Sequence, residues 1–130
     1  MITAYEAIGG EAVVRAVLRD LYDALFDDPM VGFLFEGKDK EHIVEQQVAF
    51  TGAFLGGPQR YLGKPLPEAH AQLPLLPGHF DRRHTLLKQV LARHRIGETE
   101  RAVWLRIDQG LRPSVLAAGV AARADTHGSS

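Results

Sequence analysis

The chain has 130 residues, a length that predicts a single domain with one core. Its 15 Lys and Arg and 16 Asp and Glu leave a formal net charge of −1, so we expect no binding to nucleic acid or to anionic membranes. Because the sequence has no cysteine, disulfides and thiolate metal sites are excluded. No apolar run is long enough to cross a membrane, and the first residues do not resemble a signal peptide. These features together predict a cytoplasmic protein.

Helical periodicity runs through almost the whole chain, and no segment alternates for long enough to be a strand, so the predicted class is all-α. We expect one domain over residues 1–120 and a disordered tail over 121–130, which is polar and small. The predicted helices cover residues 5–8, 11–26, 40–55, 78–94 and 98–116.

Helix-ending residues separate these segments. Glycine pairs at 9–10 and 56–57 stop the first and third helices. Asp39 is placed to cap the helix that follows it. Pro113 lies inside the last predicted helix and should kink it.

Two of the predicted helices carry a stripe of side chains that should face the interior. The second helix has apolar residues at the i, i+3, i+4, i+7 and i+11 positions. These residues are Val14, Val17, Leu18, Leu21 and Leu25. The inner stripe expected for the third helix consists of Ile43, Gln47, Phe50 and Phe54.

Three helices each place a polar side chain on or beside an apolar stripe: Tyr22, Gln47 and His84. Burying such a group without a partner costs about 1–3 kcal/mol. Each has an ordinary structural interpretation, as a tyrosine bonded to a carbonyl, a glutamine at the solvent boundary or a satisfied core histidine. Together they indicate an apolar pocket that contains a few polar groups.

The segment 61–77, YLGKPLPEAHAQLPLLP, contains four prolines, which resist helix interiors and favour an irregular connector. It is rich in leucine and contains one histidine, His70. An apolar connector that carries an imidazole indicates that something lies against it. Motifs of other sites are missing, because the sequence has no HExxH, CxxC, GxSxG, GxGxxG or GxxxxGK[ST].

The two glycine pairs, Tyr22, Gln47 and His70, in their order and spacing, make the sequence resemble a truncated haemoglobin over about residues 5–116. YEAIGGEAVV is similar to the opening helix of that family and its glycine pair. LYDALFDDPMVGFLFEG resembles its distal-tyrosine helix and the turn after it. QQVAFTGAFLGGPQRYLGKPLPEAH resembles the distal helix and the approach to the proximal histidine. The resemblance implies a two-over-two helical sandwich around haem b.

The resemblance also implies the site residues. His70 takes the place of the proximal histidine, which ligates the haem iron. Tyr22 and Gln47 take the places of the distal residues that contact a bound ligand, and Ile43 matches the distal position one turn earlier. Packing against the porphyrin is implied for Phe35 and Phe50, and a position near the propionates for Tyr61. Leu66 and Phe80 are expected to contact the cofactor as well.

The sequence resembles two different subgroups of the truncated haemoglobins. The first half resembles group I, whereas HAQLPLLPGHFDRR resembles group III. In the group III register, His84 falls where a tryptophan usually lines the distal pocket. In the group I register, Arg83 falls there instead. Both registers stay open from the sequence, as does iron ligation by His42 or His84.

The function implied is reversible binding of O₂, and of CO or NO, at a pentacoordinate or weakly hexacoordinate iron. Hydrogen bonds from Tyr22 and Gln47, each of about 1–2 kcal/mol, would slow O₂ release by roughly ten- to several-hundred-fold. Slow release suits NO dioxygenation or ligand sensing, with a reductase partner, better than oxygen transport; a peroxidase-like activity is also open. The alternative is a non-haem helical interaction module in which His70 is structural.

Overall fold

The computed structural model describes residues 2–58, 76–113 and 116. Within these residues the chain forms five α-helices and one 3-10 helix and no strand, which confirms the predicted all-α class. None of these helices is long and apolar enough to cross a membrane. The elements are α1 (Ala4–Ile8), α2 (Gly10–Asp27), η1 (Gly32–Phe35), α3 (Lys40–Phe54), α5 (Pro77–Arg93) and α6 (Glu98–Gly110).

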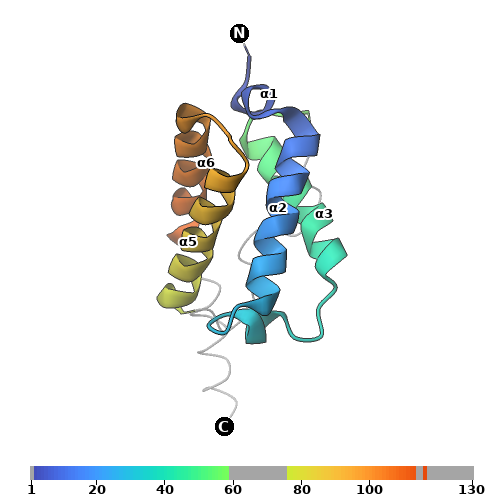
Figure 1. Cartoon of the computed structure of the whole chain (residues 1–130), viewed down its shortest axis with the longest axis vertical. Coiled ribbons are helices and arrows are strands. Elements are labelled where there is room, and N and C mark those ends of the chain that lie inside the picture. Colours follow the sequence, from blue (N-terminus) through green and yellow to red (C-terminus); the bar gives the residue numbers. More distant parts are fainter. Residues whose placement is uncertain (1, 59–75, 114–115, 117–130) are drawn as a thin grey trace.

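The four long helices form two pairs, with α2 and α3 packed together on one side and α5 and α6 on the other (Figure 1). The pairs meet through α2, which packs against α5, while α1 contacts α2 and α6. The 3-10 helix η1 follows α2 at the opposite end of the molecule from α1 (Figure 1). This arrangement is the predicted two-over-two helical sandwich.

The core is centred on the predicted stripe of α2. All five of its apolar residues are at most 1% exposed, and α3 and α5 supply most of the facing side chains. Burying one such side chain stabilises the fold by about 1.5–3 kcal/mol relative to leaving it in water. The same core cluster includes Tyr5, Phe80, Leu87, Leu91 and Trp104 from other helices.

The helix ends follow the local signals in the sequence. The Asp39 carboxylate accepts a hydrogen bond from the backbone N–H of His42 at 3.3 Å, which confirms the predicted cap of α3. Gly9 joins α1 to α2 with a φ of +127°, and a Cβ at this position would overlap the side chain of Val13. Only glycine therefore permits this turn.

A buried carboxylate fastens the turn between α2 and η1 to α5. One oxygen of Asp28 accepts hydrogen bonds from the backbone N–H groups of Met30 at 3.1 Å and Val31 at 3.2 Å. The other oxygen accepts from Arg82 Nε at 3.1 Å and Nη2 at 2.7 Å. The hydrogen bond from Arg82 is the main reason that the pKa of Asp28 lies below its usual value.

The last helix differs from the prediction. α6 ends at Gly110 rather than at residue 116, and Leu111 forms a turn whose N–H bonds to the Asp108 carbonyl at 3.1 Å. Arg112, Pro113 and Leu116 are again helical. Proline has no N–H and cannot donate a hydrogen bond to the preceding turn of a helix. Pro113 therefore removes one of the backbone hydrogen bonds that would continue α6 beyond Gly110.

Candidate functional site

The inner face of α3 differs from the predicted stripe. Val44 and Val48 are 1% and 3% exposed and belong to the core around α2, yet neither was in the prediction. Of the predicted stripe only Phe50 is buried, whereas Ile43 and Gln47 are half-buried. Since α3 has apolar residues on two adjacent faces, its spacing did not identify the face that packs on α2.

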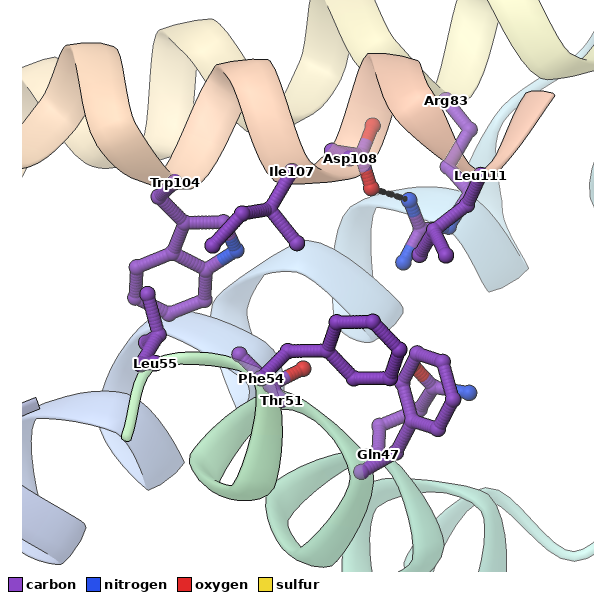
Figure 2. Close-up of a pocket in the computed structure, with 10 residues that line it drawn as sticks. Gln47, Thr51, Phe54, Leu55, Arg83, Trp104, Ile107, Asp108 and Leu111 are labelled. Atoms are coloured by element: carbon purple, nitrogen blue, oxygen red, sulfur yellow. Dashed lines mark hydrogen bonds and ion pairs between the residues drawn. The ribbon is translucent and has the colours of Figure 1, made fainter. Parts of the chain in front are cut away.

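The second face of α3 borders a small pocket between α3, α5 and α6, with a volume of about 20 Å³. This volume is enough for about one water-sized molecule. Arg83 and Asp108 point toward one another at one end of the pocket and Trp104 lies at the other end (Figure 2). The lining residues are Gln47, Phe50, Thr51, Phe54, Leu55, Arg83, Trp104, Ile107, Asp108 and Leu111.

An acidic residue of α6 organises the polar end of this pocket. Asp108 is only 5% exposed, and its Oδ1 accepts a hydrogen bond from Arg83 Nη1 at 2.5 Å. Its Oδ2 lies 2.8 Å from His84 Nδ1. Burial acts to raise the pKa of Asp108, but the charge of Arg83 and the hydrogen bonds from both neighbours lower it below the usual value.

Tyr22 lies beside this ion pair. The residue is buried, and the Arg83 guanidinium carbon is 5.9 Å from the centre of its ring, within the range of a cation–π contact. Burial acts to lower the pKa of Arg83, but the charge of Asp108 raises it above the usual value. Arg83 is therefore charged, paired with Asp108 of α6 and placed over the ring of Tyr22.

Sequence reasoning missed Asp108. The signal was present, because Asp108 lies four residues after Trp104 and next to Ile107 on the apolar side of the last helix. It is a polar residue on an apolar face, the same kind of signal that identified Tyr22 and Gln47.

Arg83 and His84, which are neighbours in the sequence, lie differently with respect to the pocket. Arg83 lines the pocket, as the group I register implies, whereas His84 is bonded to Asp108 and does not appear among the lining residues. A direct contact of His84 with a ligand stays a prediction that this placement does not support. His42 is exposed. No group of three or more His, Cys, Asp or Glu that could hold a metal ion occurs in the described residues.

Some of the residues predicted to contact the haem lie within the described part of the chain, and the others lie outside it. Phe35 is half-buried, stacks on Phe26 with ring centres 4.9 Å apart, and meets Tyr22 edge-on at 6.0 Å. Phe50 and Phe80 are buried. Three of the predicted site residues lie outside the described residues: His70, Tyr61 and Leu66.

The sequence and the fold both match known globins. Residues 3–112 match the model of the family described as Bacterial-like globin, so the chain belongs to the bacterial-like globin family. The group 1 truncated haemoglobin of Tetrahymena pyriformis is 38% identical over 79 residues, which cover 61% of this chain and 65% of that protein, just under two thirds. GlbN, a group 1 truncated haemoglobin of Nostoc sp. (strain MUN 8820), is 35% identical over 81 residues that cover 62% of this chain and 69% of that protein.

Solved structures extend the likeness over most of the chain. The Fe(III) form of the Tetrahymena pyriformis truncated haemoglobin has a TM-score of 0.82 and 29% identity, covering 88% of this chain and 97% of that one. The haemoglobin of Chloroflexus aurantiacus has a TM-score of 0.79 and 29% identity, covering 88% and 98%. Within its family the chain is therefore a truncated haemoglobin.

Membership of this family implies a haem cofactor, and the described residues fit one. Phe54, which lines the small pocket, is 51% exposed, and Phe33 is 57% exposed. Phe33 and Phe35 border an open hollow of about 520 Å³ beside η1. Adjoining exposed apolar side chains mark surfaces that a bound group can cover, and Phe33 and Phe35 at this hollow would suit a flat, mostly apolar macrocycle.

Proposed function

We propose that this chain holds haem b through His70 and reversibly binds O₂, CO or NO at the open axial position. The observation that carries the proposal is the globin match over residues 3–112, which spans the buried Tyr22 and the donor-rich pocket beside it. Haem supplies an iron that takes diatomic ligands, while the protein sets the axial ligand, the distal hydrogen bonds and the access route.

The distal residues of this chain would act as hydrogen-bond donors. Gln47 lines the pocket with its amide, and Tyr22 lies one side chain away, in contact with Arg83. Bound O₂ draws negative charge, so the Tyr22 hydroxyl and the Gln47 amide would hold it. Ile43 would add an apolar wall that limits access of water.

Strong retention of O₂ favours NO dioxygenation or ligand sensing over oxygen transport. Dioxygenation would need a reductase that returns the iron to the ferrous state. We propose in addition that residues 1–120 form a single domain and that the protein is cytoplasmic.

Spectra of the reduced protein test this function. The protein is reduced without oxygen, exposed to O₂ and then returned to argon. We expect the ferrous spectrum to change on exposure and to recover under argon. A haem-loaded protein that oxidises at once, with no O₂ spectrum even at short times, would contradict reversible binding. A purified chain that takes up no haem would instead favour the helical interaction module.

Tyr22→Phe provides the matched variant in the same experiment. Losing one hydrogen bond should speed O₂ release by roughly ten-fold or more. CO release should change less because bound CO carries less negative charge. Equal changes for both gases would mean that the hydroxyl does not contact the ligand.

A further inference from the structure

The positive charge of Arg83 lies beside the two side chains that are expected to contact a bound ligand. Arg83 lines the small pocket together with Gln47, and its guanidinium carbon is 5.9 Å from the centre of the Tyr22 ring. Figure 2 shows the guanidinium at the pocket end of its side chain, on the side of the pocket where Gln47 lies. The distal side therefore holds a cation in addition to its two neutral donors.

Asp108 fixes the position of this cation. One of its oxygens accepts from Arg83 Nη1 and the other lies 2.8 Å from His84 Nδ1. The side chains of Arg83 and Asp108 are 22% and 6% exposed, so water and salt screen these charges only weakly. A guanidinium carries five N–H groups and no acceptor, so Arg83 can pair with Asp108 and still donate to a molecule in the pocket.

We propose that Arg83 donates directly to a small ligand bound at the haem and gives this site a preference for anions over neutral molecules. The inference rests on the proposed function, because the ligand would bind at the haem. It deepens that function by naming the class of ligand. That class is small anions on the ferric form, and O₂ rather than CO on the ferrous form, since bound O₂ carries more negative charge.

Charge and size both support this class. Hydrogen bonds from a charged donor to an anion are roughly twice as strong as those between neutral groups, so a guanidinium discriminates between anions and neutral molecules more than an amide or a hydroxyl does. The pocket has a volume of about 20 Å³, room for about one water-sized group. It therefore suits the outer end of a diatomic or triatomic ligand.

Arg83 and Asp108 should act on a bound anion with opposite signs. Both side chains line the pocket, and an anion is attracted by the guanidinium and repelled by the carboxylate. The competing interpretation is a purely structural ion pair that ties α5 to α6. In that case the loss of either partner should disturb the pocket in the same direction.

Ligand affinities of the haem-loaded protein separate the two interpretations. The chains are wild type, Arg83→Met, Asp108→Asn and the control Arg82→Met. The dissociation constants of azide and fluoride are measured for the ferric form at neutral pH, and that of CO for the ferrous form. The infrared stretching band of bound azide is also recorded, because it reports on donors next to the ligand without any turnover.

Arg82→Met is the matched control. Arg82 precedes Arg83 in α5, but it pairs with Asp28 at the turn between α2 and η1 instead of lining the pocket. The substitution removes a guanidinium and an ion pair from the same helix without changing the charges that line the pocket. It should lower thermal stability and change the azide affinity by less than about two-fold.

We expect Arg83→Met to weaken the binding of azide and fluoride by about ten-fold or more, the effect of one charge-assisted hydrogen bond, and to shift the azide band. The CO affinity of this variant should change by less than about two-fold, because bound CO carries little charge. Asp108→Asn keeps an acceptor oxygen for Arg83 but removes the negative charge. It should therefore tighten azide binding by about three-fold or more.

Three results would overturn this inference alone. Weaker azide binding in both Arg83→Met and Asp108→Asn would show that the two residues act as a structural pair. Equal losses of azide and CO affinity in Arg83→Met would show that the pocket had lost its shape instead of a charge. An unchanged azide affinity and azide band in a folded Arg83→Met would show that the guanidinium does not reach the ligand.

Asp108→Asn decides the question if Arg83→Met does not fold. Tighter azide binding in Asp108→Asn would then support the inference, and unchanged or weaker binding would overturn it. A wild-type chain that takes up no haem would overturn the proposed function and this inference together.

Discussion

Two neighbouring arginines of α5 point to two different buried carboxylates. Arg82 reaches Asp28 at the end of α2, and Arg83 reaches Asp108 on α6. Adjacent residues on a helix project about 100° apart, so this pair fastens α5 to elements on both of its sides. The first contact secures the turn that begins η1, and the second borders the pocket.

At the residue scale, Asp28→Ala should lower the free energy of unfolding by about 1–3 kcal/mol. The change removes the acceptor of the Val31 N–H, a buried donor, and of the Arg82 guanidinium. Urea unfolding measures this loss. Asp27→Ala is the control, since Asp27 is the exposed neighbour and its removal should change little. Equal stabilities of the two variants would contradict the role given to Asp28.

At the element scale, the sequence predicted where most helices begin and end, but it identified the buried face of α2 and not that of α3. The Asp39 cap and the α2 stripe depend on local spacing, and both agree with the structure. The face of α3 depends on what packs on either side of it, and there the prediction was wrong for Val44 and Val48. Asp108 lies on the apolar face of its own helix, a signal that was overlooked, but its partners Arg83 and His84 come from another helix and could not be read from local spacing.

The sequence could not decide whether Arg83 or His84 faces the pocket, because this also depends on contacts between helices. The sequence places the two side chains about 100° apart on α5 but does not fix the rotation of the helix. The packing of Phe80, Leu87 and Leu91 against α2 fixes that rotation. It turns Arg83 to the pocket and leaves His84 on the flank, bonded to Asp108.

Asp39→Ala tests the start of α3, the helix that carries Gln47 to the pocket. Without the carboxylate the His42 N–H loses its partner, and the protein should lose about 0.5–2 kcal/mol of stability. Asp39→Asn is the matched variant, because asparagine caps helices about as well as aspartate. Thermal unfolding of the three chains measures the effect. A loss in Asp39→Asn as large as that in Asp39→Ala would mean that charge, not capping, matters here.

At the scale of the whole molecule, the two buried carboxylates make stability depend on pH. The pKa values of Asp28 and Asp108 are lowered in the folded state, so the unfolded chain binds protons more readily. Their contribution is fully present above the unfolded pKa, near 3.8, and is lost as the pH falls toward the lower folded values.

We therefore expect the stability difference between wild type and Asp28→Asn to be largest near neutral pH and to shrink below about pH 4. Urea unfolding of both haem-loaded chains at several pH values measures it. Comparing the two chains cancels the effect of acid on haem retention, which they share. A difference that stays constant down to the acid transition would contradict the lowered pKa of Asp28.

The central claim is that this globin holds haem through His70, and the absorption spectrum of purified protein tests it most directly. Wild type, His70→Ala and the control His42→Ala are each loaded with haem, and ferric and ferrous CO-bound spectra are recorded. We predict an intense Soret band with stoichiometric haem in wild type and in His42→Ala, whose histidine is exposed. His70→Ala should lose haem or bind it weakly and recover a native-like spectrum with added imidazole. A native-like spectrum in His70→Ala without imidazole, or no Soret band in wild type, would contradict the account.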